Sequence, residues 1–263
     1  MTPGTHTQST RNQVLALMVL SALSGTMGCG DEPSSNGNGE VRSTGPSQTF
    51  GNGTAQAFVT LNAAGIPTAL GVLLSESVLT SLPATMTEAI LALPDQGAAT
   101  PFNFVRVTFM PQGHPPPGIY DKAHFDLHFF LITEQEVSAV GPSDPDFQQK
   151  GAQAPPPEHT PPDYVPDPMA IPGHGTHWSD PTSPEFNGQP FTATLIYGFY
   201  EGRAIHLEPM VTSAFLLTQP DFTQAIKLPD SFAEPGLYPT SYSVSFDSAA
   251  TEYLISLEGL TAR

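Results

Sequence analysis

Histidine and carboxylate side chains are concentrated between His114 and Glu208, and both are groups that bind divalent metal ions. The stretch from His114 to His206 holds seven of the eight histidines in the chain. Imidazole together with carboxylate suits Zn, Mn, Fe or Ni, and ligand type alone does not choose among these metals. The candidate metal ligands are His124, Asp126, His128, His177 and Glu208.

Two predicted strands carry most of these candidates. Side chains alternate between the two faces of a strand, so His124, Asp126 and His128 point to one face. The residues between them are apolar and point to the other face. In a later strand, His206 and Glu208 share a face in the same way. If the polar faces of the two strands meet, they form one site.

The spacing of His124 and His128 limits how one ion could be held. Successive residues in a strand rise by roughly 3.3 Å, which separates these two residues by about 13 Å. In a helix they would be close, but the zinc-protease motif requires Glu directly after the first His, and Phe125 stands there. A metalloprotease is therefore not expected. The spacing favours a site in which Asp126, or a histidine beside it, joins the two candidates from later in the chain.

The same alternation also fits a sheet with one solvated face. Antiparallel sheets commonly place one face on the core and the other in water, and a His-Asp-His row is polar enough for the wet face. In that interpretation the polar cluster is structural, and the protein is a non-catalytic binding or stress-response module of the cell envelope. In the other, the side chains converge on a metal ion, and the sequence does not define an activity.

Motifs for other common chemistries are absent from the sequence. It contains no Gly-x-Ser-x-Gly elbow, no Walker A loop, no Gly-x-Gly-x-x-Gly fingerprint and no pair of cysteines. Met169 and Met210 are expected in the core rather than as copper ligands. Pro209 lies inside a predicted strand, and because proline cannot donate to the ladder, an edge strand or a bulge is expected there.

Short apolar runs separated by glycine and proline predict a mainly β fold. The chain contains 23 Gly and 29 Pro, which indicates many turns and few long helices. We expect an antiparallel sandwich or barrel with short helices. Residues 141–176 form a long Pro-rich loop, which is either functional or loosely ordered. The expected strands are 55–61, 68–74, 102–110, 123–133, 191–200, 204–217, 242–246 and 253–257, with 87–93 left open between helix and strand.

The N-terminal residues have the pattern of an export signal. Arg11 precedes a short apolar run, and the Gly-Cys-Gly sequence around Cys29 resembles a bacterial lipobox, in which the cysteine is acylated. The alternatives for Cys29 are ordinary cleavage nearby or a buried free thiol. We expect a lipoprotein signal peptide over residues 1–28, a disordered tether over 29–54 and a single β-rich domain over 55–263.

The charge balance of the chain excludes some partners. Its formal net charge is −17 at pH 7, and such a surface repels nucleic acid and anionic lipid headgroups. The expected membrane contact is therefore the lipid on Cys29, which places the domain in the cell envelope, facing the periplasm or the cell surface. The sequence does not identify a small-molecule ligand.

Four motifs lie in the segments that carry the candidate ligands. They are Gly-His-Pro-Pro at 113–116, His-Phe-Asp-Leu-His-Phe-Phe at 124–130, Gly-Thr-His-Trp at 175–178 and Glu-Pro-Met at 208–210. Together they resemble an uncharacterised family of secreted or lipid-anchored bacterial proteins, represented by a sigma-factor-regulated protein from a thermophile. The resemblance covers roughly residues 55–220.

The resemblance implies a β-rich, exported protein and is compatible with homo-oligomers, but it supplies no activity. The family pattern reads Gly-His-Glu-Pro and then His-Phe-Asp-x-His-Phe-Tyr, whereas Pro115 and Phe130 replace the Glu and the Tyr here. The loss of the Glu removes an acid group from that position. All five candidate ligands lie in the motifs that define the family. The resemblance therefore favours a shared site over a solvated face.

Overall fold

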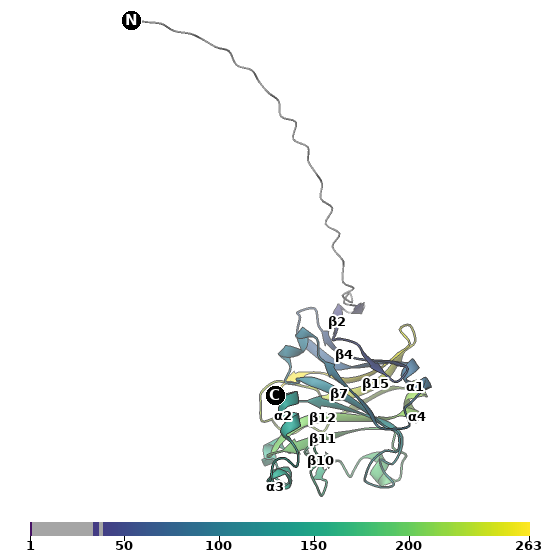
Figure 1. Ribbon diagram of the computed structural model, residues 1–263, viewed down its shortest axis with the longest axis vertical. Coiled ribbons are helices and arrows are strands. Elements are labelled where there is room, and N and C mark those ends of the chain that lie inside the picture. Colours follow the sequence, from purple (N-terminus) through teal and green to yellow (C-terminus); the bar gives the residue numbers. More distant parts are fainter. Residues whose placement is uncertain (2–33, 37–38) are drawn as a thin grey trace. The chain divides into compact units, whose positions relative to one another are not determined.

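Alternating apolar residues build two large antiparallel sheets that pack against each other (Figure 1). The computed structural model describes Met1, residues 34–36 and residues 39–263. Every strand pairing within these residues is antiparallel. The prediction of a mainly β sandwich with short helices is confirmed. The barrel alternative is wrong, because the sheets of the described residues stay open.

The first sheet is built around two hairpins. It has the strand order β1-β2-β4-β5-β16-β15-β13, and β3 also pairs with β4. In the β4–β5 turn, Oδ1 of Asn62 accepts hydrogen bonds from the backbone N–H groups of Ala64 and Ile66. The strands are β1 Ser34–Asn36, β2 Glu40–Thr44, β3 Gln48–Phe50, β4 Gly53–Leu61, β5 Pro67–Ser75, β13 Asp221–Ala225, β15 Ser241–Asp247 and β16 Glu252–Glu258.

The second sheet carries the candidate ligands. Its strand order is β6-β7-β8-β12-β11-β10-β9, so β8 lies beside β12 although a long segment separates them in the sequence. The segment that the sequence left open between helix and strand forms β6. The strands are β6 Thr87–Ala92, β7 Phe104–Met110, β8 His124–Phe130, β9 Val165–Pro166, β10 Thr176–Ser179, β11 Ala193–Tyr200 and β12 Arg203–Thr212.

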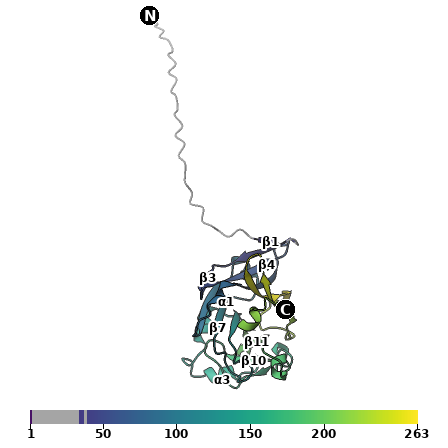
Figure 2. The same ribbon diagram turned by 90° about the vertical axis from the view of Figure 1, so that its right-hand side faces the viewer.

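Short helices and a small sheet complete the fold. A capping box starts α2, where the Thr133 side chain accepts from the backbone N–H of Glu136 and the Glu136 carboxylate accepts from that of Thr133. Figure 2 shows α3 at the end of the domain opposite β1 and β4. The remaining elements are the helices α1 Ser77–Thr80, α2 Glu134–Ala139, α3 Phe147–Gly151 and α4 Ser213–Leu216, the 3-10 helices η1 Asp95–Ala99, η2 Pro157–His159 and η3 Pro184–Asn187, and the paired strands β14 Leu237–Tyr238 and β17 Thr261–Ala262.

The main core lies between the two large sheets. Phe125, Leu127 and Phe129 of β8 are fully buried there, in the same apolar cluster as Ala57 and Val72 of the first sheet. Because β8 turns its odd-numbered residues toward this core, its even-numbered polar residues must lie on the outer face of the second sheet.

The outer face of the second sheet is covered by protein rather than by water. Two smaller apolar clusters pack on it, one that contains Phe130 and Val137 and another that contains Tyr120 and Ile196. The Pro-rich residues 141–176 belong to the connection between β8 and β11, and they contain α3, η2 and β9. This segment therefore has regular structure and forms part of the cover.

The predicted tether is too long at its C-terminal end. Residues 40–54 contain β2 and β3, both of which pair with β4. The side chain of Phe50 is 1% exposed and lies in the main core. Backbone pairing adds strands to a sheet even where the side chains are polar, so composition alone misses them. Residues from Pro33 to Arg263 form one compact unit.

A chain that begins at Ala55 is expected to be much less stable than one that begins at Gly39. The shorter chain lacks β2, β3 and Phe50, and loss of a buried Phe side chain alone costs about 3–5 kcal/mol. Thermal unfolding of the two chains measures the difference. Equal melting temperatures would mean that residues 40–54 contribute nothing to the fold.

Pro209 lies in a central strand, so the expectation of an edge strand is wrong. Strand β12 lies between β8 and β11. Its ladder to β8 keeps one register on both sides of Glu208 and Pro209 but lacks those two pairs. The proline is tolerated because the ladder is interrupted where it has no N–H group to donate. A bulge does occur nearby, between Gly198 and Phe199 of β11.

The predictions about export fall outside the described residues. Both the signal peptide over residues 1–28 and Cys29 precede Ser34, where the description of the folded part begins. Among the described residues, no helix has the length and apolar character needed to cross a membrane. The lipid anchor therefore stays a prediction.

Candidate metal centre

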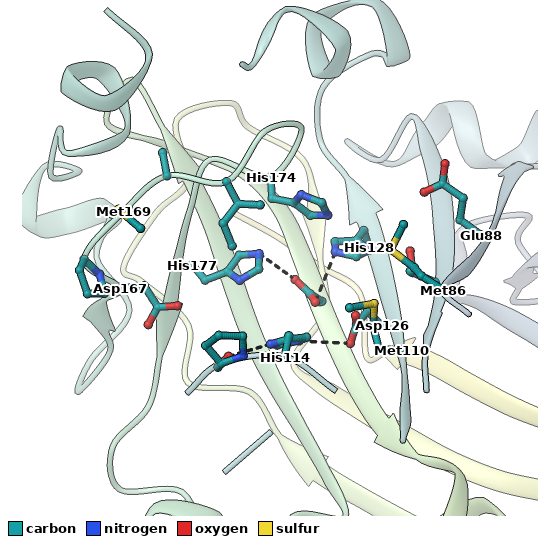
Figure 3. A pocket seen from close by; sticks show the side chains of 16 residues that line it. Met86, Glu88, Met110, His114, Asp126, His128, Asp167, Met169, His174 and His177 are labelled. Carbon is teal, nitrogen blue, oxygen red and sulfur yellow. Dashed lines mark hydrogen bonds and ion pairs between the residues drawn. The ribbon is translucent and has the colours of Figure 1, made fainter. Parts of the chain in front are cut away.

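Histidines and two carboxylates gather on the outer face of the second sheet (Figure 3). Of the seven histidines in the described residues, only His159 lies away from this group. Three strands and two loops bring the other six histidines together with Asp126 and Glu208. They are His124, Asp126 and His128 from β8, His206 and Glu208 from β12, His177 from β10, His114 from the loop before β8 and His174 from the loop before β10.

These polar side chains are buried, so the interpretation of the row as a solvated sheet face is wrong. His124, His206 and Glu208 are 0% exposed, and His128 and Asp126 are 2% and 4% exposed. Alternation of polar and apolar residues indicates a wet face only where nothing packs on the polar side. Here the connection between β8 and β11 packs on it.

Glu208 lies at the centre of the more deeply buried group, which we name the Glu208 cluster. Its Oε1 lies 3.3 Å from Nε2 of His128, and its Oε2 lies 3.5 Å from Nε2 of His177. Ligating atoms of the three residues all lie within 4.8 Å of one another. Tetrahedral bonds of about 2.0–2.1 Å to zinc place neighbouring ligand atoms about 3.3 Å apart. The observed spacing therefore fits a single ion.

Hydrogen bonds in the Glu208 cluster leave its ligating atoms free. Nδ1 of His128 donates to the backbone carbonyl of Arg106 at 3.4 Å, so Nε2 keeps a lone pair that points to Glu208. Metal-bound histidines commonly donate their second N–H in this way. Both carboxylate oxygens of Glu208 and Nε2 of His177 are buried and have no hydrogen-bond partner among the described residues.

His206 lies beside Glu208, outside the three residues whose ligating atoms all lie within 4.8 Å of one another. Its Nδ1, 3.6 Å from Oε2 of Glu208, also lacks a partner within the described part of the chain, whereas its Nε2 donates to the carbonyl of His174 at 3.1 Å. The imidazole occupies the space above Gly198, where an added Cβ would overlap Nε2 of His206. Glycine at 198 is therefore what gives this histidine room.

His114, His124 and Asp126 form a second group, which we name the Asp126 cluster. Oδ1 of Asp126 lies 2.8 Å from Nε2 of His124 and 3.7 Å from Nε2 of His114. Nδ1 of His124 donates to the carbonyl of Lys122 at 2.6 Å. Nε2 of His124 and Oδ1 of Asp126 are both buried and have no hydrogen-bond partner among the described residues.

The sequence predicted that His124 and His128 are too far apart along an extended strand to hold one ion easily, and the two separate clusters agree with this. His124 and His128 contribute to different groups of ligating atoms, as their separation along an extended strand requires. The histidine beside Asp126 that joins Glu208 is His128. Asp126 does not join that group, because the register pairs it with Met210 and so places it diagonally from Glu208.

Burial sets the protonation of the Glu208 cluster. It raises the pKa of Glu208 well above its usual value, and the negative charge of Asp126 adds to the rise. Burial also lowers the pKa of His177 to about 3 and that of His128 well below its usual value, with His174 contributing to both shifts. Without a metal ion, the cluster therefore holds neutral imidazoles and a carboxyl group that favours its protonated form.

His174 lines the cavity, but both of its ring nitrogens are already used. Nδ1 donates to the carbonyl of Pro172 at 2.9 Å, and Nε2 accepts from the Arg106 guanidinium at 2.8 Å. Arg106 also donates to the carbonyl of Gly173 and lies over the ring of Phe130. His174 therefore positions Arg106 rather than serving as a ligand.

The sequence prediction of ligands did not include His114 and His206. A signal for His206 was present, because it lies two residues before Glu208 on the same strand face. No sequence signal shows where the side chain of His114 lies, since it comes from an irregular loop. The expectation for Met169 is wrong, because it is 69% exposed beside the cavity, whereas Met210 is buried as expected.

Comparison with known proteins supports the family resemblance over part of the chain. Residues 62–109 match the TTHB210-like family, described as hypothetical protein TTHB210. The matched segment ends before the first candidate ligand, so it does not bear on either cluster, on lipid anchoring or on regulation by a sigma factor. No curated protein and no solved structure matches the chain significantly. From residue 62 to residue 109, the chain is thus similar to an uncharacterised family.

Proposed function

We propose that the protein binds a divalent metal ion through His128, His177 and Glu208. The observation that carries this proposal is the set of buried ligating atoms without hydrogen bonds, namely both oxygens of Glu208 and Nε2 of His177. A buried polar group without a partner costs about 1–3 kcal/mol, and more when it is charged. A divalent cation would satisfy these atoms together and would neutralise the carboxylate.

The donor set suits an ion that acts on a bound molecule. Structural zinc sites are closed by four protein ligands, whereas catalytic zinc sites use three and leave a position for water or substrate. Two histidines and one carboxylate also form the ligand set of non-haem Fe(II) oxygenases. Zn, Mn, Fe and Ni all fit these donors. All three residues line the cavity, so an open coordination position would face it.

We propose that the Asp126 cluster binds a second divalent ion, more weakly than the Glu208 cluster binds the first. Its member His114 has a side chain that is 18% exposed. A proton between His124 and Asp126 also satisfies that contact, so metal and proton compete there. The competing candidate function is a non-catalytic module in which protons alone hold both clusters together. The unpaired oxygens of Glu208 favour the metal.

Metal analysis of the purified protein tests the proposal. We expect at least one divalent ion per chain, and a chelator should lower the melting temperature by roughly 10 °C, since a ligand at 1,000 times its Kd adds about 4 kcal/mol of stability. His159→Ala, which changes the histidine away from the cavity, should leave the chelator effect intact. Metal-free protein, purified without chelator and insensitive to it, would overturn the proposal.

We further propose that a lipid on Cys29 anchors the domain outside the cytoplasm. The support is the position of this only cysteine after a short apolar run. Acylation requires the thiol, so Cys29→Ser should abolish palmitate incorporation and release the protein from the membrane fraction. Radiolabelled palmitate and cell fractionation measure both effects. Equal labelling of the variant and the wild type would contradict the anchor.

A further inference from the structure

A cavity of about 550 Å³ opens onto the candidate ligands. The Glu208 cluster and Asp126 belong to its lining, and His114, His174, Glu88 and Asp167 add further polar groups (Figure 3). Cavities that bind small molecules typically measure about 300–1,000 Å³ and combine an apolar lining with a few polar groups. The size of this cavity therefore suits a small molecule in addition to a metal ion.

The rest of the cavity wall is mainly apolar. Met86 and Met110 lie on one side and Met169 on the opposite side (Figure 3), and Ile171 and Pro168 add to the lining. A metal ion makes no use of such a wall, because its ligands are all at the polar part. Apolar walls gain free energy when they exclude water against another apolar surface.

Several of these apolar side chains are exposed. Met86, Met169 and Ile171 are 60%, 69% and 40% exposed, respectively. Large apolar side chains that gather around one opening indicate an interaction site, whereas singly scattered ones do not. Methionine is unbranched and flexible, so it adapts its contacts to the shape of a bound molecule.

We propose that the cavity binds a small amphiphilic molecule. Its oxygen-bearing headgroup coordinates the metal ion of the Glu208 cluster, and its apolar body lies between Met86, Met169 and Ile171. The headgroup part of this inference rests on the metal site proposed above. A flat protein partner fits less well, because the donor atoms lie inside a concave site rather than at the surface.

Two hydroxamates that share a metal-coordinating headgroup test the proposal on the full domain loaded with Zn²⁺. Octanohydroxamate carries six more methylene groups than acetohydroxamate, and each buried methylene tightens binding about fourfold. If three of them enter the cavity, octanohydroxamate should bind at least about 50-fold more tightly, as measured by calorimetry.

Charged substitutions beside the cavity provide the matched comparison. Met86→Glu/Met169→Glu should weaken octanohydroxamate binding about tenfold or more and leave acetohydroxamate binding unchanged. The control Ile66→Glu/Leu217→Glu changes two side chains that are 51% and 64% exposed but lie outside the cavity lining. This control should bind both hydroxamates as the wild type does.

Failure of this inference is distinguishable from failure of the metal site. Equal affinity for the two hydroxamates on protein that retains Zn²⁺ would overturn the amphiphile proposal alone. An equal loss of octanohydroxamate binding in the control variant would also overturn it. Protein that retains no Zn²⁺ and binds neither hydroxamate would overturn the metal site and, with it, the headgroup contact.

Discussion

Glu208→Gln is expected to abolish tight metal binding while leaving the metal-free protein folded. Gln keeps the shape of the side chain but has no negative charge and only one acceptor oxygen. Loss of groups that merely orient ligands weakens metal binding about 10- to 100-fold, so loss of a ligand should exceed about 100-fold. Calorimetric titration with Zn²⁺ gives the affinity, and the chelator effect on the melting temperature should disappear.

The stability of the metal-free variant separates a binding defect from a folding defect. Because burial raises the folded pKa of Glu208 above its unfolded value, this carboxyl contributes stability at low pH that is lost as the pH rises through the folded pKa. Gln does not titrate, so the metal-free variant should be at least as stable as metal-free wild type at about pH 8. A variant that unfolds there, or that binds Zn²⁺ as tightly as the wild type, would contradict this role of Glu208.

At pH values below the folded pKa of Glu208, metal affinity is expected to increase about tenfold for each unit by which the pH is raised. The reason is that metal binding displaces one proton. The sequence alone would assign such a dependence to imidazoles that protonate as the pH falls toward about 5. Burial of the histidines rules out this explanation. It lowers the pKa of His177 to about 3 and that of His128 well below its usual value, so both rings are already neutral. The displaced proton should therefore come from Glu208, whose pKa burial raises.

Calorimetry in buffers with different ionisation enthalpies counts the protons released. About one proton per ion is expected at a pH below the folded pKa of Glu208, and none for Glu208→Gln with whatever weak binding remains. His159→Ala should behave as the wild type. Release of two or more protons at this pH would mean that the histidines, not the carboxyl, control the pH dependence.

Strand periodicity predicted which side chains share a face, but it did not predict which faces are buried. The alternation along β8 correctly separated His124, Asp126 and His128 from the apolar residues between them. Whether water or protein covers the polar face depends on the connection between β8 and β11, whose path is not encoded in any local pattern. Strand periodicity alone therefore did not choose between the two interpretations of the polar row.

The partners of each ligand depend on strand order, which local sequence does not reveal. His128 lies close to Glu208 because β8 is the neighbour of β12 in the sheet. His177 lies close to Glu208 because β10 pairs with β11, which in turn pairs with β12. Spacing along one strand was sufficient only to exclude a single ion between His124 and His128. The tether boundary failed for a related reason, since strands β2 and β3 add to an edge mainly through backbone hydrogen bonds.

The neighbourhood of β8 and β12 has a consequence for folding kinetics. Residues 131–202 lie between these two strands in the sequence, and the entropy cost of closing that segment must be met before His128 and Glu208 approach each other. We therefore expect the metal-binding atoms to assemble late on the folding pathway. Interactions that form after the transition state slow unfolding and leave the folding rate nearly unchanged. A bound ion would therefore lengthen the lifetime of the folded domain rather than help the chain to reach it.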